Sequence, residues 1–103
     1  MKQIVENTLC LNCNNTEQFS EVIISKFKND GEPMRMSLLL WPTKEKTLEG
    51  LITIGYECCD PEYEKEVNFK GKSINEICNW ITTLKKQYHT KDSVLNLLKQ
   101  HKK

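Results

Sequence analysis

Five cysteines are the residues in this chain of 103 residues whose type and spacing could do chemistry. Cys10 and Cys13 form a C-x-x-C pair, whose two-residue gap lets both thiolates of a tight knuckle bind one metal ion. Asn12 and Asn14 favour such a knuckle, because asparagine tolerates a positive φ better than most other residues. The pair therefore predicts half of a tetrahedral zinc site.

Cys58 and Cys59 are expected to supply the other half of that site. They lie near the tip of a predicted hairpin, where a regular strand would direct neighbouring side chains to opposite faces. Both sulfurs reach one ion only if the turn begins at Cys58. Otherwise only one of the two binds, and His89, or less readily Cys78, completes the site.

The fifth cysteine, Cys78, falls on the apolar face of a predicted helix, where a thiol acts as a small core residue. A redox dithiol at Cys10 and Cys13 is disfavoured, because the pair has no basic neighbour and begins no clear helix. The expected ligands of one structural zinc ion are therefore Cys10, Cys13, Cys58 and Cys59. Four protein ligands close the site and leave no position for a reactive zinc-bound water.

Two absences bear on the expected compartment. The first ten residues contain no apolar segment typical of a signal peptide. The longest apolar run, Leu38–Trp41, is far shorter than the roughly 20 residues that a membrane span requires. We therefore expect a soluble protein of the reducing cytosol, where disulfides rarely persist.

Catalytic groupings are sparse in the sequence, and we do not expect an enzyme. Cys78, His89 and Asp92 are the only cysteine, histidine and acid that stand close together, and three helical turns separate Cys78 from His89. The four glycines are scattered, so none of them forms a phosphate-binding loop.

Charge is segregated along the chain, although its formal net value is only +1. Residues 57–66 carry five acidic side chains and one basic side chain, whereas residues 67–103 carry eight lysines against Glu76 and Asp92. Such neighbouring fields can steer a charged partner. The balance is too even for a dedicated nucleic-acid binder or for a whole-molecule mimic of DNA.

The elements that must position the cysteines are predicted to be strands first and helices last. Two hairpins are expected, the first from strands at 22–27 and 34–41 around Asn29-Asp30-Gly31, the second from strands at 51–58 and 63–69. Residues 41–46 are expected to form a surface loop. Residues 17–28 also fit a helix, because their apolar side chains recur at helical spacing as well.

Two helices are expected after the strands. Ser73 and Glu76 form a capping box, followed by an apolar face that recurs at helical spacing as far as Tyr88. A second helix begins after His89, capped by Thr90 or Asp92. The sequence therefore predicts one α+β domain over residues 1–103: an antiparallel sheet of about four strands, two C-terminal helices and an N-terminal zinc knuckle.

A resemblance adds to this interpretation. The chain resembles the small anti-CRISPR proteins of phages and prophages in low-GC Gram-positive bacteria, in particular a zinc-containing inhibitor of a type II effector nuclease. The resemblance lies in the segments CLNC and ECCD, in a composition rich in lysine, asparagine and isoleucine, and in a single strand-rich domain. The resemblance implies binding to the effector protein and interference with loading of its target DNA. The near-neutral charge differs from that of the acidic DNA mimics and favours a steric or allosteric block.

The function expected from the sequence is therefore a protein-binding inhibitor of a CRISPR effector nuclease, or of another host protein, acting in the host cytosol. The alternative is a zinc-dependent nucleic-acid-binding accessory protein. Its phosphate contacts would come from the lysine-rich C-terminal helices, through Lys85, Lys86, Lys91 and Lys99.

Overall fold

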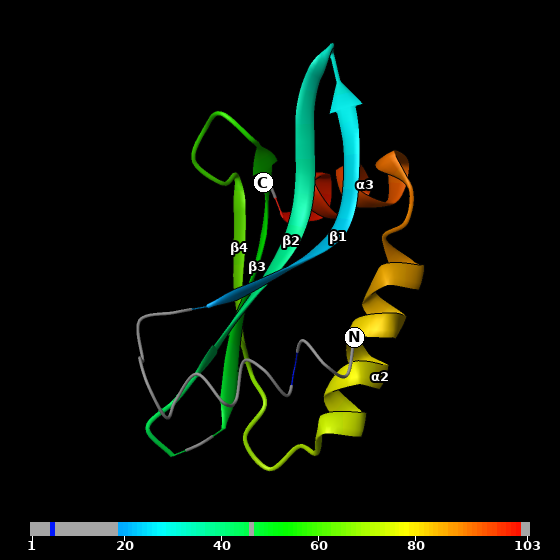
Figure 1. The fold of residues 1–103 in the computed structure, drawn as a ribbon. Helices are drawn as coiled ribbons and strands as arrows, with labels where there is room; N and C mark the ends of the chain where they lie inside the picture. The colour runs from blue at the N-terminus through cyan, green and yellow to red at the C-terminus, as the bar shows by residue number, and fades with distance from the viewer. Residues whose placement is uncertain (1–4, 6–18, 46, 102–103) are drawn as a thin grey trace.

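The architecture comes from a computed structural model, which describes residues 5, 19–45 and 47–101. Four strands, β1 (Ser20–Asn29), β2 (Glu32–Pro42), β3 (Leu48–Tyr56) and β4 (Tyr63–Asn68), pair in sequence order to form one antiparallel sheet. Two helices, α2 (Ile74–Gln87) and α3 (Lys91–His101), follow the strands (Figure 1). The predicted α+β arrangement of strands followed by helices is thus confirmed.

The first hairpin turns through two residues that both have a positive φ. Asp30 has a φ of 52° and Gly31 a φ of 82°. Two-residue turns of this kind match the right-handed twist of paired strands, and aspartate and glycine tolerate them well. The turn sets the pairing of Asn29 with Glu32, so the segment that also fitted a helix forms strand β1 from Ser20 onward.

Both helices begin at side-chain caps. The Ser73 hydroxyl accepts a hydrogen bond from the Glu76 N–H at 3.2 Å, as the capping box predicts. At α3 the Thr90 hydroxyl accepts from the Ser93 N–H at 3.2 Å, and the Thr90 N–H donates to the Ser93 hydroxyl at 3.3 Å. Thr90, rather than Asp92, therefore caps the second helix.

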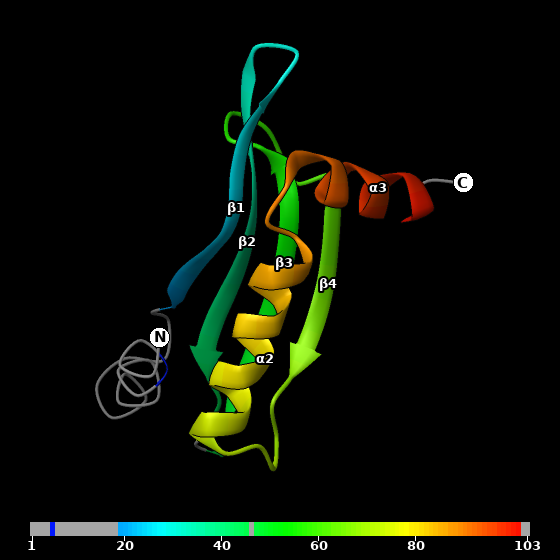
Figure 2. The same ribbon diagram turned by 90° about the vertical axis from the view of Figure 1, so that its right-hand side faces the viewer.

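One face of the sheet carries the core. Figure 2 shows α2 covering the strands on this face and running roughly along them. The β2 side chains that point toward the helices, which include Met36 and Leu38, are fully buried, and they meet Ile54 of β3 and Ile81 of α2. Because side chains alternate along a strand, every second residue of β2 contributes to this core.

The opposite face of the sheet is not covered by either described helix. Its apolar side chains are Ile23, Leu39, Trp41 and Leu51, and all four are half-buried rather than buried. Ser37 stands among them and is only 1% exposed. We call this surface the open face.

Most predicted strand boundaries shift by one to three residues, and two of these shifts have a clear cause. Strand β2 continues to Pro42, one residue beyond the predicted strand and inside the expected loop, because the chain keeps pairing with β3 as far as Leu48 opposite Pro42. Strand β3 ends at Tyr56, two residues earlier than expected, because the Cys59 N–H donates to the Tyr56 carbonyl and closes a turn. Within the described ranges, neither helix has the length and apolar character to cross a bilayer.

Candidate metal centre

The loop between β3 and β4 presents Cys58 and Cys59 side by side. The chain turns at Glu57 and Cys58, and the Cys59 N–H bonds to the Tyr56 carbonyl at 3.2 Å. In an extended strand the two side chains would point to opposite faces. The turn instead brings their sulfur atoms to 3.4 Å from each other.

This separation suits two thiolates that share one metal ion. Zinc–sulfur bonds of about 2.3 Å at tetrahedral angles place neighbouring sulfurs about 3.8 Å apart, so a small opening of the pair is enough. Both side chains are exposed, and a metal ion can therefore approach them from solvent. From the sequence, a shared site required the turn to begin at Cys58, and the turn begins one residue earlier, at Glu57.

Gly55 lets the loop fold back onto β3. A Cβ atom at this position would lie 2.9 Å from the Cα of Pro61 and 3.3 Å from the backbone nitrogen of Glu62. Both neighbours are main-chain atoms, which cannot move without shifting the loop. The absence of a side chain at Gly55 is therefore part of what places the two cysteines.

Replacing Gly55 by alanine is expected to lower the free energy of unfolding by about 1–3 kcal/mol, because the new methyl group overpacks against the loop. The same change should alter the rate at which Cys58 and Cys59 react with a thiol reagent. Urea denaturation and labelling kinetics measure the two effects. Thr53→Ala, two residues earlier on the same face, is the control and should change both little. Unchanged stability and labelling in Gly55→Ala would contradict the close approach.

The neighbouring thiol affects the protonation of Cys59. The pKa of Cys59 is raised, first by its hydrogen bond with Cys58, next by charge repulsion from Cys58, then by desolvation, and further by the negative charges of Glu32 and Asp60. The Cys59 thiol therefore retains its proton at neutral pH. Because a metal ion must displace this proton, its binding should weaken as the pH falls.

The other residues considered from the sequence lie elsewhere. Cys10 and Cys13 fall outside the described residues, so their part in a metal site stays a prediction. Cys78 is half-buried and packs against the core from α2. His89 follows α2, and its Nδ1 atom is 2.8 Å from the Lys86 carbonyl oxygen. The segment that joins α2 to α3 lies on the other side of the strands from the β3–β4 loop (Figure 1).

Within the described part of the chain, no three cysteine, histidine or acidic side chains come together as metal ligands. There, Cys58 and Cys59 are the two expected ligands that lie side by side, and the other two expected ligands, Cys10 and Cys13, fall outside it.

Two hollows beside strand β4 were missed by the sequence analysis. One, of about 440 Å³, lies between the end of β4 and α2 and includes Trp80 in its lining. The other, of about 320 Å³, lies on the open face and includes Trp41. The sequence offered one signal for them, the presence of two tryptophans, but it placed Trp41 where the predicted strand 34–41 meets the expected loop.

Comparison with known proteins returns no relationship. No protein-family model, no curated protein and no solved structure matches this chain.

Proposed function

We propose that this chain is a protein-binding inhibitor that acts in the host cytosol on a nuclease of the CRISPR effector class, with one structural zinc ion that stabilises its fold. The observation that carries the proposal is the open face of the sheet. On β2, Leu38 and Leu40 are fully buried beneath the helices, whereas Leu39 and Trp41 on the opposite face keep part of their surface in water. Apolar groups grouped on an accessible face favour contact with another protein.

The surroundings of the apolar surface support a protein partner with a basic surface. Four carboxylates and three basic side chains share the face of Leu39: Glu21, Glu49, Glu64, Glu66, Lys26, Lys28 and Arg35. Arg35 is already paired with Glu21 at 3.4 Å. The basic side chains lie on β1 and β2, and the charged side chains of this face on β3 and β4 are all carboxylates. This half of the face repels phosphate groups and complements the basic protein surface that a nuclease uses for nucleic acid.

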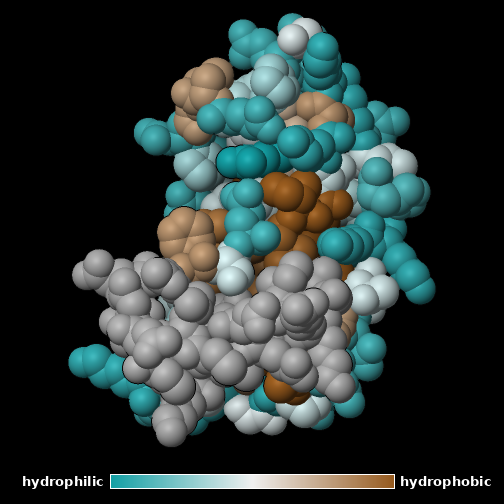
Figure 3. All heavy atoms as spheres, in the orientation of Figure 1, coloured by the Kyte–Doolittle hydropathy of each residue, from teal (hydrophilic) through white to brown (hydrophobic). Residues whose placement is uncertain are grey.

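Apolar groups also reach the surface along β1 and directly before it. Phe19, directly before β1, is 60% exposed. Figure 3 shows apolar atoms near the β1 edge of the sheet, with hydrophilic groups above and beside them. An apolar centre with a polar rim is the usual anatomy of a protein interface.

Zinc enters the proposal as a structural ion. The half-site of Cys58 and Cys59 lies on the β3–β4 loop, and Cys10 and Cys13 would join the N-terminal segment to it. Such a site stabilises the fold and leaves partner binding to the surface of the sheet.

The test measures inhibition of a purified type II effector nuclease. The wild-type protein is expected to copurify with the effector and to reduce its loading of target DNA. Leu39→Arg, which puts a charge at the centre of the open face, should weaken binding by at least about tenfold. Lys86→Glu, an exposed change on α2, is the control and should bind as the wild type does. An effector that loads DNA normally in excess protein would contradict the nuclease assignment.

The alternative of nucleic-acid binding has one supporting feature. Thr82, Lys85, Lys86 and His89 line a shallow hollow at the end of α2, where two ammonium groups can meet a phosphate. A salt series on bare DNA and RNA decides between the two functions. Tight binding that falls steeply with salt, and that Lys86→Glu weakens, would favour this alternative over the protein-binding proposal.

A further inference from the structure

Strand β4 forms one edge of the sheet, and its backbone groups on the outer side have no strand partner in the described chain. The Phe69 N–H donates to the Leu48 carbonyl at 3.0 Å, just beyond the end of β4. Because pairs alternate along an antiparallel ladder, every second residue back from Phe69 faces β3. The N–H and C=O groups of Glu64, Glu66 and Asn68 therefore point away from the sheet.

The two edges of the sheet differ in their regularity. The register of β1 against β2 shifts between Ile23 and Ser25, which is a bulge, and bulges hinder the addition of a further strand. The register of β4 against β3 is continuous over all six residues of β4. The outer edge of β4 is thus the one suited to pair with another extended segment.

A hollow lies beside this edge on the helix side. Val67, Phe69, Ile77 and Trp80 supply its apolar lining. The rings of Phe69 and Trp80 meet edge to face, with centroids 5.3 Å apart. The volume of about 440 Å³ accommodates an apolar side chain of a segment that lies along β4.

A second hollow lies beside the same edge on the open face. Trp41, Glu49, Glu66 and Asn68 contribute to its lining. The indole N–H of Trp41 donates to Glu49 at 3.1 Å, which holds a carboxylate beside the ring. An aromatic face next to two carboxylates favours a cationic side chain, and arginine most of all, because its guanidinium can stack and form hydrogen bonds.

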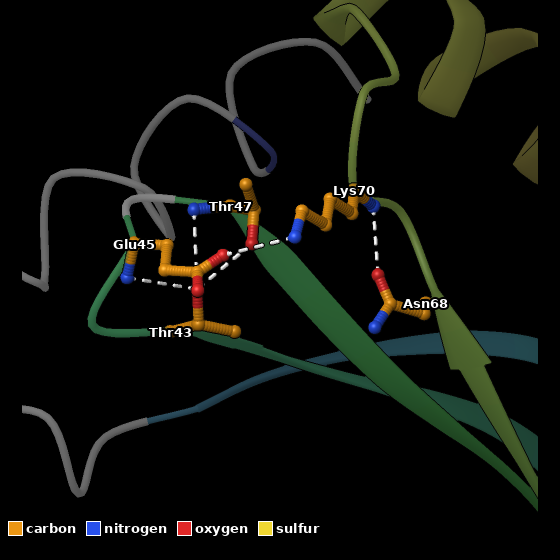
Figure 4. A network of polar contacts seen from close by, with 5 residues as sticks. All are labelled: Thr43, Glu45, Thr47, Asn68 and Lys70. Carbon is orange, nitrogen blue, oxygen red and sulfur yellow. Dashed lines mark hydrogen bonds and ion pairs between the residues drawn. The ribbon is translucent and has the colours of Figure 1, made fainter.

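Polar contacts lie at the end of β4, between these two hollows. The Asn68 side-chain oxygen accepts from the Lys70 N–H at 2.8 Å, and the Lys70 ammonium lies 3.5 Å from the Glu45 carboxylate (Figure 4). The Thr43 and Thr47 hydroxyls, 2.8 Å apart, close the β2–β3 turn beside them. An exposed ion pair thus links the segment after β4 to the β2–β3 turn.

We propose that the outer edge of β4 binds an extended segment of a partner protein, which pairs as a fifth strand. Neighbouring side chains of an added strand point to opposite faces. The segment therefore places apolar side chains in the helix-side hollow and basic side chains, at alternate positions, in the open-face hollow. The inference rests on the proposed function only in taking the partner to be a protein.

Charge decides among the candidate occupants. If a second copy of this chain paired through β4, it would bring Glu64 and Glu66 close to the same glutamates of the other copy, and like charges across strands are destabilising. An acidic segment meets the same repulsion. A segment with alternating apolar and basic side chains complements both faces of the edge.

The test uses a short synthetic peptide of alternating valine and arginine, capped at both ends, and the full-length protein. The control peptide has the same composition, with its valines and arginines in separate blocks. We expect the alternating peptide to bind at least about tenfold more tightly than the block peptide. Amide exchange at Glu64, Glu66 and Asn68 should slow when it binds. Equal affinities for the two peptides, or exchange protection at another surface, would overturn the proposal.

Two variants of one residue separate backbone pairing from charge. Glu66→Pro removes an outward N–H, so it should weaken binding of the alternating peptide by about tenfold or more. Glu66→Lys keeps the backbone and reverses the charge, so it should prefer a valine–glutamate peptide. Glu32→Lys, the same charge reversal at an exposed position at the start of β2, is the matched control and should bind as the wild type does. The proposal would be overturned if both Glu66 variants bound the alternating valine–arginine peptide with wild-type affinity and kept the wild-type preference for it over the valine–glutamate peptide. This holds even if one of the variants folded poorly.

These measurements contain no nuclease, so their failure is distinct from failure of the proposed function. Effector inhibition by the same variants is measured separately. Inhibition that persists while the alternating peptide binds no better than the block peptide would refute strand addition at β4 and leave the inhibitor proposal standing. Selective peptide binding without inhibition would refute the nuclease assignment and leave this inference standing.

Discussion

Cys59→Ser is expected to lower the zinc content and the thermal stability of the protein together. The change removes one of two sulfurs that lie 3.4 Å apart, and hydroxyl oxygen is a poor zinc ligand. Structural zinc sites contribute apparent binding energies on the order of 10–16 kcal/mol at neutral pH. Partial loss of such a site should cost several kcal/mol and lower the unfolding midpoint by more than about 10 °C. Elemental analysis and thermal unfolding of the same sample measure the two effects.

Two comparisons make this result specific. Cys13→Ser should act like Cys59→Ser, because both sulfurs belong to the proposed ligand set. Cys78→Ser should leave the zinc content unchanged and cost about 1–3 kcal/mol, because it places a hydroxyl against the core. Protein purified without added metal that contains less than about 0.2 zinc per chain would refute the site.

Leu38→Ala is the second large change and is expected to cost about 3–5 kcal/mol of unfolding free energy. The Leu38 side chain is 0% exposed at the centre of the sheet, where it pairs across to Val22 and Ile52. Truncation leaves a cavity that the paired strands cannot close. Each kcal/mol should lower the unfolding midpoint by roughly 4–8 °C. Urea denaturation, with its slope compared between variants, gives the free energy directly.

Leu39→Ala provides the matched control, since it is the same substitution one position later. Leu39 points to the open face and is only half-buried, so its loss should cost about 1 kcal/mol. Equal losses for the two leucines would mean that the open face is as well covered in solution as the helix face, and would contradict its role as an accessible surface.

Several elements could be predicted from the sequence because local interactions determine them. Asp30 and Gly31 specify a tight turn through their tolerance of positive φ, and Ser73 specifies the start of α2 through its hydroxyl. Every second side chain of β2 is a large apolar one, which indicates that one face of the strand belongs to the core. The strands therefore follow from patterns that span only a few residues.

The predicted elements were less accurate where pairing across the sheet overrides local preference. Pro42 suggested a loop, yet its position opposite Leu48 at the end of the ladder lets the strand include it. The first arm fitted a helix as well as a strand, and its pairing with β2 selected the strand.

What the sequence determined by itself was the set of candidate zinc ligands and the order of elements that carry them. Only the tertiary structure decided that Cys58 and Cys59 converge, because that depends on the loop folding back against Gly55. The hollows beside the outer edge of β4, where we propose that a partner segment binds, likewise depend on tertiary structure. Trp41 and Glu66 line one hollow, and Val67 and Trp80 line another, because strand pairing and helix packing unite segments that are distant in the chain. Residue types specify the possible chemistry, whereas long-range packing specifies which residues meet.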